Sequence, residues 1–229
     1  HTKFIDETPE LFEIMDSRDR ATRVLRYISE IQVANPNAER HQYDIPRFPE
    51  TKAPLGSGLK QLLDDKGPEA VKQWVLDQKK LLICDTTCRD AHQSLLATRV
   101  RTRDIVKGME GTSEILADAF SLECWGGATF DVAYRFLHES PWERLDLIRQ
   151  KAPNLLLQML IRGANAVGYT NYPDNVIREF IKEAARSGID VFRVFDSQNW
   201  IPGMEVAMDE VLNQGKICQA TLCYTGDIL

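Results

Sequence analysis

The chain has 229 residues, and 43% of them are hydrophobic, which suits a sizeable buried core and argues against wholesale disorder. Acidic residues outnumber basic ones by 34 to 28, for a formal charge of -6, and this argues against a nucleic-acid partner because phosphate neutralisation needs clustered Lys and Arg. No apolar run approaches the ~20 residues that cross a bilayer, so we expect no membrane partner.

The first eighty residues predict helices joined by an extended connector. The stretch DSRDRATRVLRYISEIQV places Val24, Leu25, Ile28 and Ile31 on one helical face. NPNAERHQYDIPRFPETKAPLGSG follows, and its four prolines and two glycines are typical of a connector. GLKQLLDDKGPEAVKQWVLDQ then predicts two short helices, the second opened by Pro68.

From residue 81 onward, strand-like and helix-like segments alternate. LLICDTT is an apolar run that ends in polar residues, which predicts a strand buried on both faces. Further on, SPWE predicts a helix capped by Ser140, and Gly188 predicts a helix end. Repeated strand–helix units of this length predict a parallel sheet with right-handed crossovers. The predicted strands start near residues 81, 119, 155, 190 and 217.

This pattern leaves two architectures open. One is a five-stranded, open, doubly wound sheet, and the other is a barrel of eight units of which five strands are present. In both, ligands bind at the carboxyl ends of the strands. The five cysteines are an odd number without a CxxC pair, and we expect them to be reduced thiols in a cytoplasmic protein.

Each predicted strand leaves polar residues at its carboxyl end, and these ends meet at one rim of a parallel sheet. A surplus of charge at that rim suits an anionic substrate and a metal. The sequence holds no Walker motif and no GxGxxG. In chain order the strand-end residues are Asp85, Arg89, Asp90, Gln93, Glu123, Asp131, Arg162, Asn165, Tyr169, Arg193, Asp196, Tyr224 and Thr225.

Several of these residues have both a functional and a structural interpretation. Asp85 and Asp90 are candidate oxygen ligands for a divalent metal, or else helix caps and ion-pair partners. Arg89 and Arg162 are candidates to clamp a carboxylate and to steady enolate charge, or else surface ion pairs. His92 is a candidate ligand or base, or else a hydrogen-bonded structural histidine. WGGAT brings backbone close to a ligand, or is only a turn.

Five long blocks of sequence, in a fixed order, carry a resemblance to a known family. They are DTTCRDAHQSLLATRVRT, WGGATFDVAYRFL, QMLIRGANAVGYTNYPDN, DVFRVFDS and CYTGD. Together they resemble the carboxyltransferase domain of the pyruvate carboxylase family. AHQSLLATR is similar to the biotin-dependent branch of a wider superfamily, a branch that also holds the oxaloacetate decarboxylase alpha subunit and the transcarboxylase large subunit. The first eighty residues favour pyruvate carboxylase within this branch.

The resemblance implies an α/β fold, a (β/α)8 barrel of the TIM type with only the first five strands present, preceded by a mostly helical linker. Residues 1–14 resemble the tail of a biotin carboxylase domain. Residues 15–55 resemble an allosteric and tetramerisation linker, and residues 56–229 the N-terminal part of the barrel. Because the chain starts at His1 and lacks three strands, we expect a stretch of a longer polypeptide, inactive when isolated.

The resemblance also implies roles for individual residues. Asp90 matches the family's metal ligand. Arg89, Gln93 and Arg162 match the catalytic group that binds pyruvate. The other metal ligands of the family, a carbamylated lysine and an HxH pair, have no counterpart here, since the histidines are His1, His41, His92 and His138. The identity of the metal, Mn, Zn or Mg, stays open.

The remaining matches concern biotin and regulation. Asp131 and Tyr169 match the pocket for the carboxybiotin ring, and Arg20 matches a contact to an acyl-CoA activator. In that family the carboxyl group of carboxybiotin, held on a carrier domain, passes to the enolate of pyruvate to form oxaloacetate, for anaplerosis or gluconeogenesis. ATP is consumed in a separate domain, and the enzyme is a homotetramer.

Two other hypotheses follow from the same sequence. The missing metal ligands and the amphipathic linker helix suit a non-catalytic fragment that serves assembly and regulation. A lyase of the same barrel superfamily is the third interpretation, and it predicts cleavage of an acyl-CoA without any response to biotin.

Overall fold

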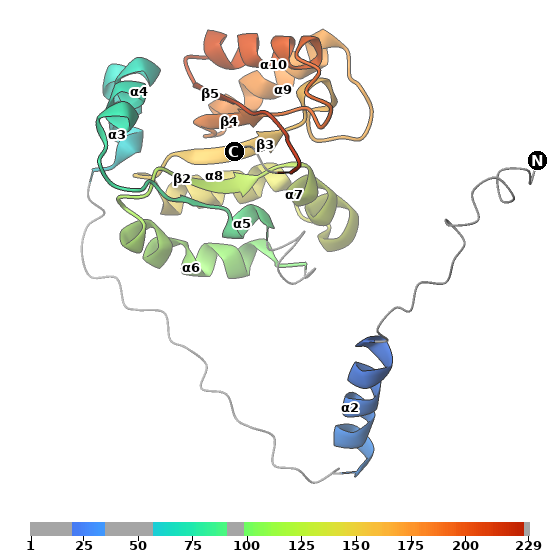
Figure 1. Ribbon diagram of the computed structural model, residues 1–229. Helices are drawn as coiled ribbons and strands as arrows, with labels where there is room; N and C mark the ends of the chain where they lie inside the picture. The colour runs from blue at the N-terminus through green and yellow to red at the C-terminus, as the bar shows by residue number, and fades with distance from the viewer. Residues whose placement is uncertain (1–19, 35–56, 91–98, 227–229) are drawn as a thin grey trace, which may run out of the picture. The chain divides into compact units, whose positions relative to one another are not determined.

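The computed structural model describes residues 20–34, 57–90 and 99–226 (Figure 1). The chain divides into two compact units, His1–Arg47 and Phe48–Leu229. The predictions for residues 1–14, for the connector after residue 34, for His92 and for Gln93 concern positions outside the described residues. No helix in the described ranges is long and apolar enough to cross a membrane.

The described part of the first unit is helix α2 (Arg20–Ala34), as its periodicity predicted. Its apolar side chains are largely exposed: 56% for Val24, 65% for Leu25 and 49% for Ile28. Arg26 forms an exposed ion pair with Glu30 one turn later, a contact of the kind that adds a few tenths of a kcal/mol to a helix. Within the described residues, these apolar side chains of α2 are therefore exposed.

A parallel sheet of five strands forms the centre of the second unit, with the strands side by side in sequence order. This confirms the predicted parallel α/β architecture. Crossover helices are required between neighbouring strands, because parallel neighbours cannot be joined by a tight turn. The strands are β1 (Cys84–Asp85), β2 (Ser121–Trp125), β3 (Leu157–Ile161), β4 (Val191–Val194) and β5 (Ile217–Ala220).

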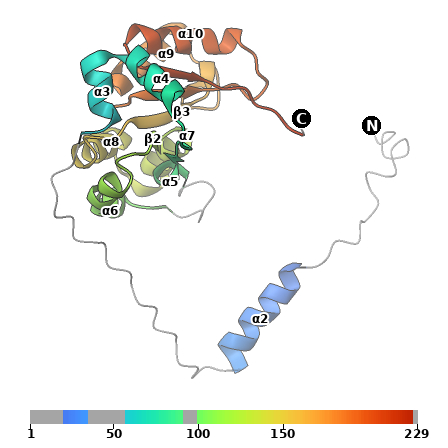
Figure 2. The same ribbon diagram turned by 60° about the vertical axis from the view of Figure 1, so that its left-hand side comes forward.

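Helices cover one face of this sheet and one end of it (Figures 1 and 2). Ser140 caps α8 by accepting a hydrogen bond from Glu143 N, as predicted. The helical elements are α3 (Leu59–Lys66), α4 (Pro68–Asp77), α5 (Thr87–Asp90), α6 (Thr102–Ile115), α7 (Gly127–Asp131), the π-helix η3 (Val132–Leu137), α8 (Pro141–Lys151), η4 (Gly163–Asn165), α9 (Asp174–Arg186) and α10 (Pro202–Asn213).

Alternate residues of each strand face different surroundings. Leu122, Met159 and Phe192 are fully buried in the main core, against apolar side chains of α6, α8, α9 and α10. Because successive side chains of a strand point to opposite faces, their neighbours Glu123 and Gln158 lie on the other face. That second face is polar in its middle, and the candidate site is built partly from it.

Helices α3 and α4 close the second face at the end where the strands begin. Leu63 and Val71 pack there with Leu156 and Val191 in a separate small core. Lys60 adds an ion pair to the buried Asp190, at 3.2 Å. In Figure 1 these helices lie at the opposite end of the sheet from α7. The carboxyl ends of the strands are therefore not covered by α3 and α4.

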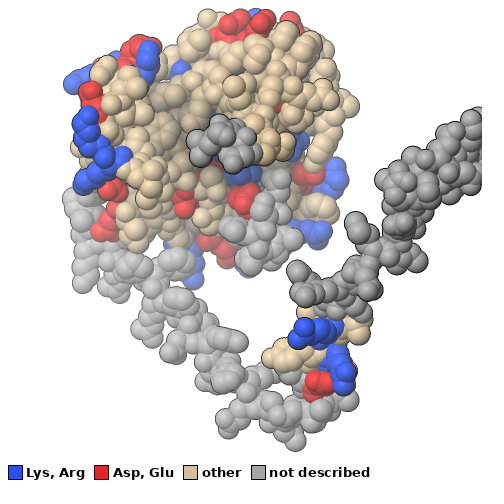
Figure 3. Space-filling view, viewed as in Figure 1, with Lys and Arg blue, Asp and Glu red and all other residues tan. Residues whose placement is uncertain are grey.

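One expectation about the first strand is wrong. LLICDTT does not form a strand buried on both faces: β1 spans two residues, while Leu81 is 92% and Ile83 56% exposed. Among the described strands β1 pairs with β2 alone, so it lies at an edge and receives cover from one side. On the face drawn in Figure 3, acidic and basic side chains are interspersed over the second unit.

Candidate functional site

Arg89 and Arg162 each lie against one member of a single glycine pair. The Gly126–Gly127 pair follows β2 and opens α7. A Cβ built on Gly126 would lie 3.3 Å from Cδ of Arg89, and one built on Gly127 would lie 2.9 Å from Cζ of Arg162. The two arginines come from the ends of β1 and β3, so the carboxyl ends of three adjacent strands bring them to one rim. Asp90 joins them, because its Oδ1 lies 3.3 Å from Nη2 of Arg89.

Glu123 holds Arg89 from below this rim. Its side chain is fully buried, and its Oε1 lies 2.5 Å from Nε of Arg89. Its Oε2 lies 3.0 Å from Nη1 of Arg193 and accepts a hydrogen bond from Nε2 of Gln158 at 2.8 Å. A buried carboxylate is stable when it is paired and its oxygens are hydrogen-bonded, and Glu123 meets both conditions.

The network continues across the polar face of the sheet. Oε1 of Gln219 accepts a hydrogen bond from Nε of Arg193 at 2.9 Å, and Ser121 donates to Oε1 of Gln158 at 2.7 Å. Glu123 and Arg193 were expected at strand ends, whereas they lie within β2 and β4. Gln158 and Gln219 were missed, although each interrupts an apolar run, LLLQMLI and ICQA. Such an amide within a strand is the signal that could have identified them.

Arg162 has a different environment from Arg89. Its Nη1 donates a hydrogen bond to the carbonyl oxygen of Gly168 at 2.9 Å, and its Cζ lies 5.1 Å from the centre of the Tyr169 ring. In the described ranges no carboxylate forms an ion pair with Arg162. A hollow of about 200 Å³ lies beside it, lined also by Asn165, Phe195, Asp196 and Ser197. Its guanidinium charge is therefore available to an anion.

Asp131 and Tyr169 also lie together, as expected. The Tyr169 hydroxyl donates a hydrogen bond to Oδ2 of Asp131 at 2.9 Å, and Nη2 of Arg135 lies 3.1 Å from the other carboxylate oxygen. Tyr169 is 68% exposed, so its ring and hydroxyl are accessible from outside. Since the Tyr169 ring also faces Arg162, this pair and the arginine belong to one continuous surface.

Cys88, between Thr87 and Arg89 in α5, packs against the main core and does not suit nucleophilic chemistry. Burial, and secondarily the nearby Asp85 carboxylate, raises the pKa of the Cys88 thiol to about 12. A thiol with so high a pKa stays protonated at neutral pH, and the thiolate is the reactive form.

The residues that the structure describes do not complete a metal site. No group of three or more His, Cys, Asp or Glu side chains converges within the described ranges. Asp90 contributes a single carboxylate, and Arg89 already contacts it. Arg20 is the first residue of α2, and its side chain lies outside what the structure describes.

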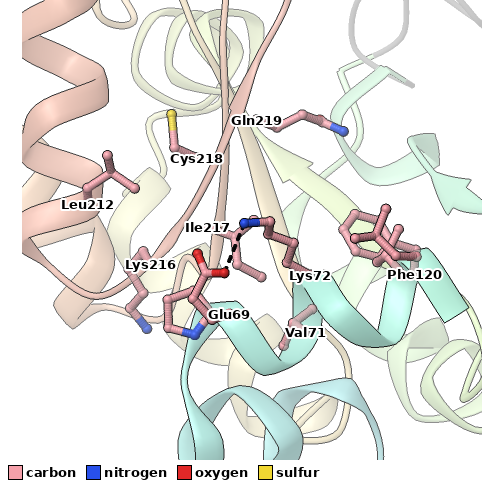
Figure 4. Close-up of a pocket in the computed structure, with 12 residues that line it drawn as sticks. Glu69, Val71, Lys72, Phe120, Leu212, Lys216, Ile217, Cys218 and Gln219 are labelled. Atoms are coloured by element: carbon pink, nitrogen blue, oxygen red, sulfur yellow. Dashed lines mark hydrogen bonds and ion pairs between the residues drawn. The ribbon is translucent and has the colours of Figure 1, made fainter.

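A second hollow lies away from this rim. It measures about 300 Å³ and lies between α4 and β5, with Val71, Phe120, Leu212 and Ile217 in its wall (Figure 4). Its only charged pair drawn in the figure, Glu69 with Lys72 at 2.9 Å, is an exposed contact within one helix. The lining is mainly apolar, unlike the charged side chains at the strand-end rim.

Several known proteins match the chain, although no protein-family model does. Pyruvate carboxylase of Staphylococcus aureus is 55% identical over 100% of the chain, and that of Bacillus subtilis is 53% identical over the same share. The chain spans about 20% of the length of these curated relatives.

Solved structures give the same result. The carboxyl transferase domain of Rhizobium etli pyruvate carboxylase with 3-bromopyruvate matches 92% of the chain and 36% of its own, at 52% identity and a TM-score of 0.78. A Rhizobium etli pyruvate carboxylase variant with the allosteric activator acetyl coenzyme-A matches 99% of the chain and 21% of its own, at the same identity and TM-score. The same carboxyl transferase domain has also been solved with oxamate and biotin, at a TM-score of 0.76.

The second unit is a parallel α/β domain with basic residues at the carboxyl ends of its strands, and it is similar to solved carboxyl transferase domains. Within that class, the chain corresponds over its whole length to a segment of pyruvate carboxylase. The resemblance inferred from its motifs is confirmed.

Proposed function

We propose that this chain forms part of a carboxyltransferase that moves the carboxyl group of carboxybiotin to pyruvate and so makes oxaloacetate. The observation that carries the proposal is Arg162, a strand-end cation with no carboxylate partner among the described residues and a hollow beside it. The identity of the relatives, and the pyruvate analogues and biotin named for the solved domains, support it.

In this proposal the five strands are the first five of an eight-stranded barrel, preceded by a linker over residues 15–55 and the tail of a biotin carboxylase domain over residues 1–14. The sequential parallel order of the strands supports this arrangement, because a (β/α)8 barrel adds its strands in chain order. A homotetramer and an acyl-CoA activator that contacts Arg20 belong to the same proposal, supported by the relative solved with acetyl coenzyme-A.

Arg162 would bind the carboxylate of pyruvate. The hollow beside it measures about 200 Å³, which leaves room for a small acid. The planar guanidinium offers paired N–H donors, which match the two oxygens of a carboxylate. Gln93 would complete the group that binds pyruvate.

Arg89 would steady the charge that develops on the substrate oxygen as a methyl proton leaves. Its Nε is engaged by Glu123, so the guanidinium is fixed before the substrate arrives. Preorganised donors of this kind act in the transition state without the cost of reorientation. Glu123 and Asp90 balance the charges of Arg89 and Arg193, which leaves Arg162 as the cation that an anionic substrate can neutralise.

Asp131 and Tyr169 would contact the biotin ring. Their hydrogen bond holds a hydroxyl and a carboxylate side by side at the exposed edge of the rim, where a tethered ring can enter. Bound carboxybiotin supplies the activated carboxyl group and, once it has lost that group, a ureido nitrogen that can accept a proton. The described residues do not by themselves complete a metal site; Asp90 would be the one carboxylate among them to hold a metal.

The test is Arg162→Ala in the full-length enzyme that carries this sequence. Oxaloacetate formation should be lost, while ATP cleavage in the biotin carboxylation half-reaction persists. The matched control is Arg186→Ala on α9, whose side chain is 76% exposed and paired with Glu183. Normal pyruvate-dependent turnover by Arg162→Ala would contradict the proposal.

A second candidate, from a different class, is a non-catalytic segment that serves assembly and regulation. The exposed apolar residues of α2 favour it, as does the lack of a metal-binding cluster among the described residues. Metal analysis of the purified chain separates the two: tightly held metal in a stoichiometric amount would contradict the assembly hypothesis.

A further inference from the structure

Gly127 lies directly beneath the guanidinium of Arg162. A Cβ at this position would lie 2.9 Å from Cζ and from Nη2 of Arg162, and 3.0 Å from Nη1. Three of the four heavy atoms of the guanidinium would thus be contacted at once, which means that the flat face of the group lies against the backbone. Ordinary contacts of a Cβ begin at 3.4 Å, so the guanidinium would have to move away.

The other contacts of Arg162 show what this glycine contributes. The carbonyl oxygen of Gly168 accepts from Nη1 on one side, and the Tyr169 ring lies over the group on another. No carboxylate among the described residues fixes the guanidinium. Its position is therefore set by one hydrogen bond, one ring and the backbone surface at Gly127, and a side chain at Gly127 would remove the last of these.

Gly126 differs from its neighbour in what a methyl group would meet. A Cβ there would lie 3.3 Å from Cδ of Arg89, but also 3.3 Å from the backbone oxygen of Leu160. A backbone oxygen in a buried sheet cannot move easily, because protein interiors are close-packed. The end of an arginine side chain can change position. A methyl group at Gly127 therefore displaces Arg162 with little disturbance of the sheet.

We propose that Gly127 is a positioning residue for substrate binding: its lack of a side chain sets where the Arg162 guanidinium lies. The inference rests on the proposed function of Arg162 as the ligand of the pyruvate carboxylate. It adds a specificity element that acts through Arg162 and does not touch the substrate. The glycine pair noted in the sequence thus serves to bring arginine side chains, rather than a ligand, against the backbone.

The test compares Gly127→Ala with Gly111→Ala in the full-length enzyme that carries this sequence. Gly111 lies in α6, and a Cβ there meets nothing within 4 Å, so it controls for the added methyl group. We expect Gly127→Ala to raise the KM for pyruvate by about tenfold or more, because a misplacement of about an ångström can cost 10²-fold. Its melting temperature and its pyruvate-independent ATP cleavage should stay close to those of Gly111→Ala.

Arg162→Lys supplies the second readout. Lysine has no planar guanidinium to meet the methyl group, so Gly127→Ala should raise the KM much less in the Arg162→Lys background than in the native one. If Gly127→Ala fails to fold, Arg162→Lys should restore folding. An unchanged KM, an equal penalty in both backgrounds, or misfolding of both variants overturns the inference. If instead Arg162→Ala turns over normally, the proposed function itself has failed.

Discussion

The carboxylate of Glu123 lies between two arginines, with Oε1 at 2.5 Å from Nε of Arg89 and Oε2 at 3.0 Å from Nη1 of Arg193. All three side chains are largely or fully buried. Because one carboxylate satisfies both cations, its removal leaves two buried guanidinium groups undercompensated.

We therefore expect Glu123→Gln to lower the free energy of unfolding by about 3 kcal/mol, since breaking a buried ion pair from one side is strongly destabilising. Urea unfolding of the full-length enzyme, followed in its carboxyltransferase transition, measures this. Glu143→Gln on the exposed side of α8 is the control and should change little. Equal stability of the two variants would show that Arg89 and Arg193 find other partners.

A substitution at Tyr169 should change the activity of the enzyme without changing its stability. Tyr169→Phe removes one hydrogen bond, to Asp131, from a side chain that is 68% exposed. Exposed polar contacts contribute little to folding, so we expect a stability change below about 0.5 kcal/mol. If the pair contacts the biotin ring, oxaloacetate formation should fall while ATP cleavage persists.

Tyr134→Phe is the matched control, because Tyr134 is another half-exposed tyrosine, at 54%. The readout is the rate of oxaloacetate formation in a coupled assay. A loss of activity of equal size in Tyr134→Phe and Tyr169→Phe would argue against a specific role for the Asp131–Tyr169 pair.

The carboxyl group of Glu139 should make the free energy of unfolding of the second unit depend on pH. Burial raises the pKa of its carboxyl group, but hydrogen bonds from Thr102 and Arg144 outweigh burial and lower that pKa from 4.5 to about 2. A carboxylate with a depressed pKa in the folded state contributes stability above its unfolded pKa, and the contribution is lost as the pH falls toward the folded pKa.

The shift corresponds to roughly 3 kcal/mol at neutral pH, lost between about pH 5 and pH 2. Glu139→Gln should therefore be less stable than the native protein at pH 7 and nearly equal to it near pH 2. Denaturant unfolding at a series of pH values measures this difference. Glu114→Gln, on the exposed side of α6, is the control, and its free energy of unfolding should follow that of the native protein at every pH. A difference that does not narrow as the pH falls contradicts the assignment.

Cys124 should resist chemical modification. It is fully buried in β2, and burial raises the pKa of its thiol above the ordinary value. Since the thiolate is the reactive form, iodoacetamide at pH 8 should leave Cys124 unmodified in the folded protein and alkylate it in guanidinium chloride. Cys223, which is only partly buried, should react before Cys124 in the folded protein. Peptide mass spectrometry gives the order in which the cysteines are alkylated. Early labelling of Cys124 would contradict the expected protection of its thiol.

The sheet could be predicted from the sequence because its buried strands are apolar runs with clear ends. The starts expected near 155, 190 and 217 lie within two residues of Leu157, Val191 and Ile217. The prediction for the first strand was wrong because hydrophobicity alone does not show whether a neighbouring element covers an apolar run. The π-helix η3 had no signal of its own either, since its backbone depends on tertiary packing.

The rim was predicted in part. Arg89, Asp90 and Arg162 were expected near one another, and the glycine pair between them accounts for how they meet. Glu123 and Arg193 were expected at the rim, but the strands continue past them, and a sequence does not show which face of a strand turns toward the helices. That choice follows from the three-dimensional arrangement of all five strands.

The order of the strands also has a kinetic consequence. Every strand from β2 to β5 pairs with the strand directly before it in the chain, so strand pairing joins only consecutive strand–helix units. Such a topology keeps loop-closure entropy small at each step. Each strand–helix unit can dock onto its predecessor as it leaves the ribosome, which makes stepwise growth from the N-terminal side during synthesis the natural folding route.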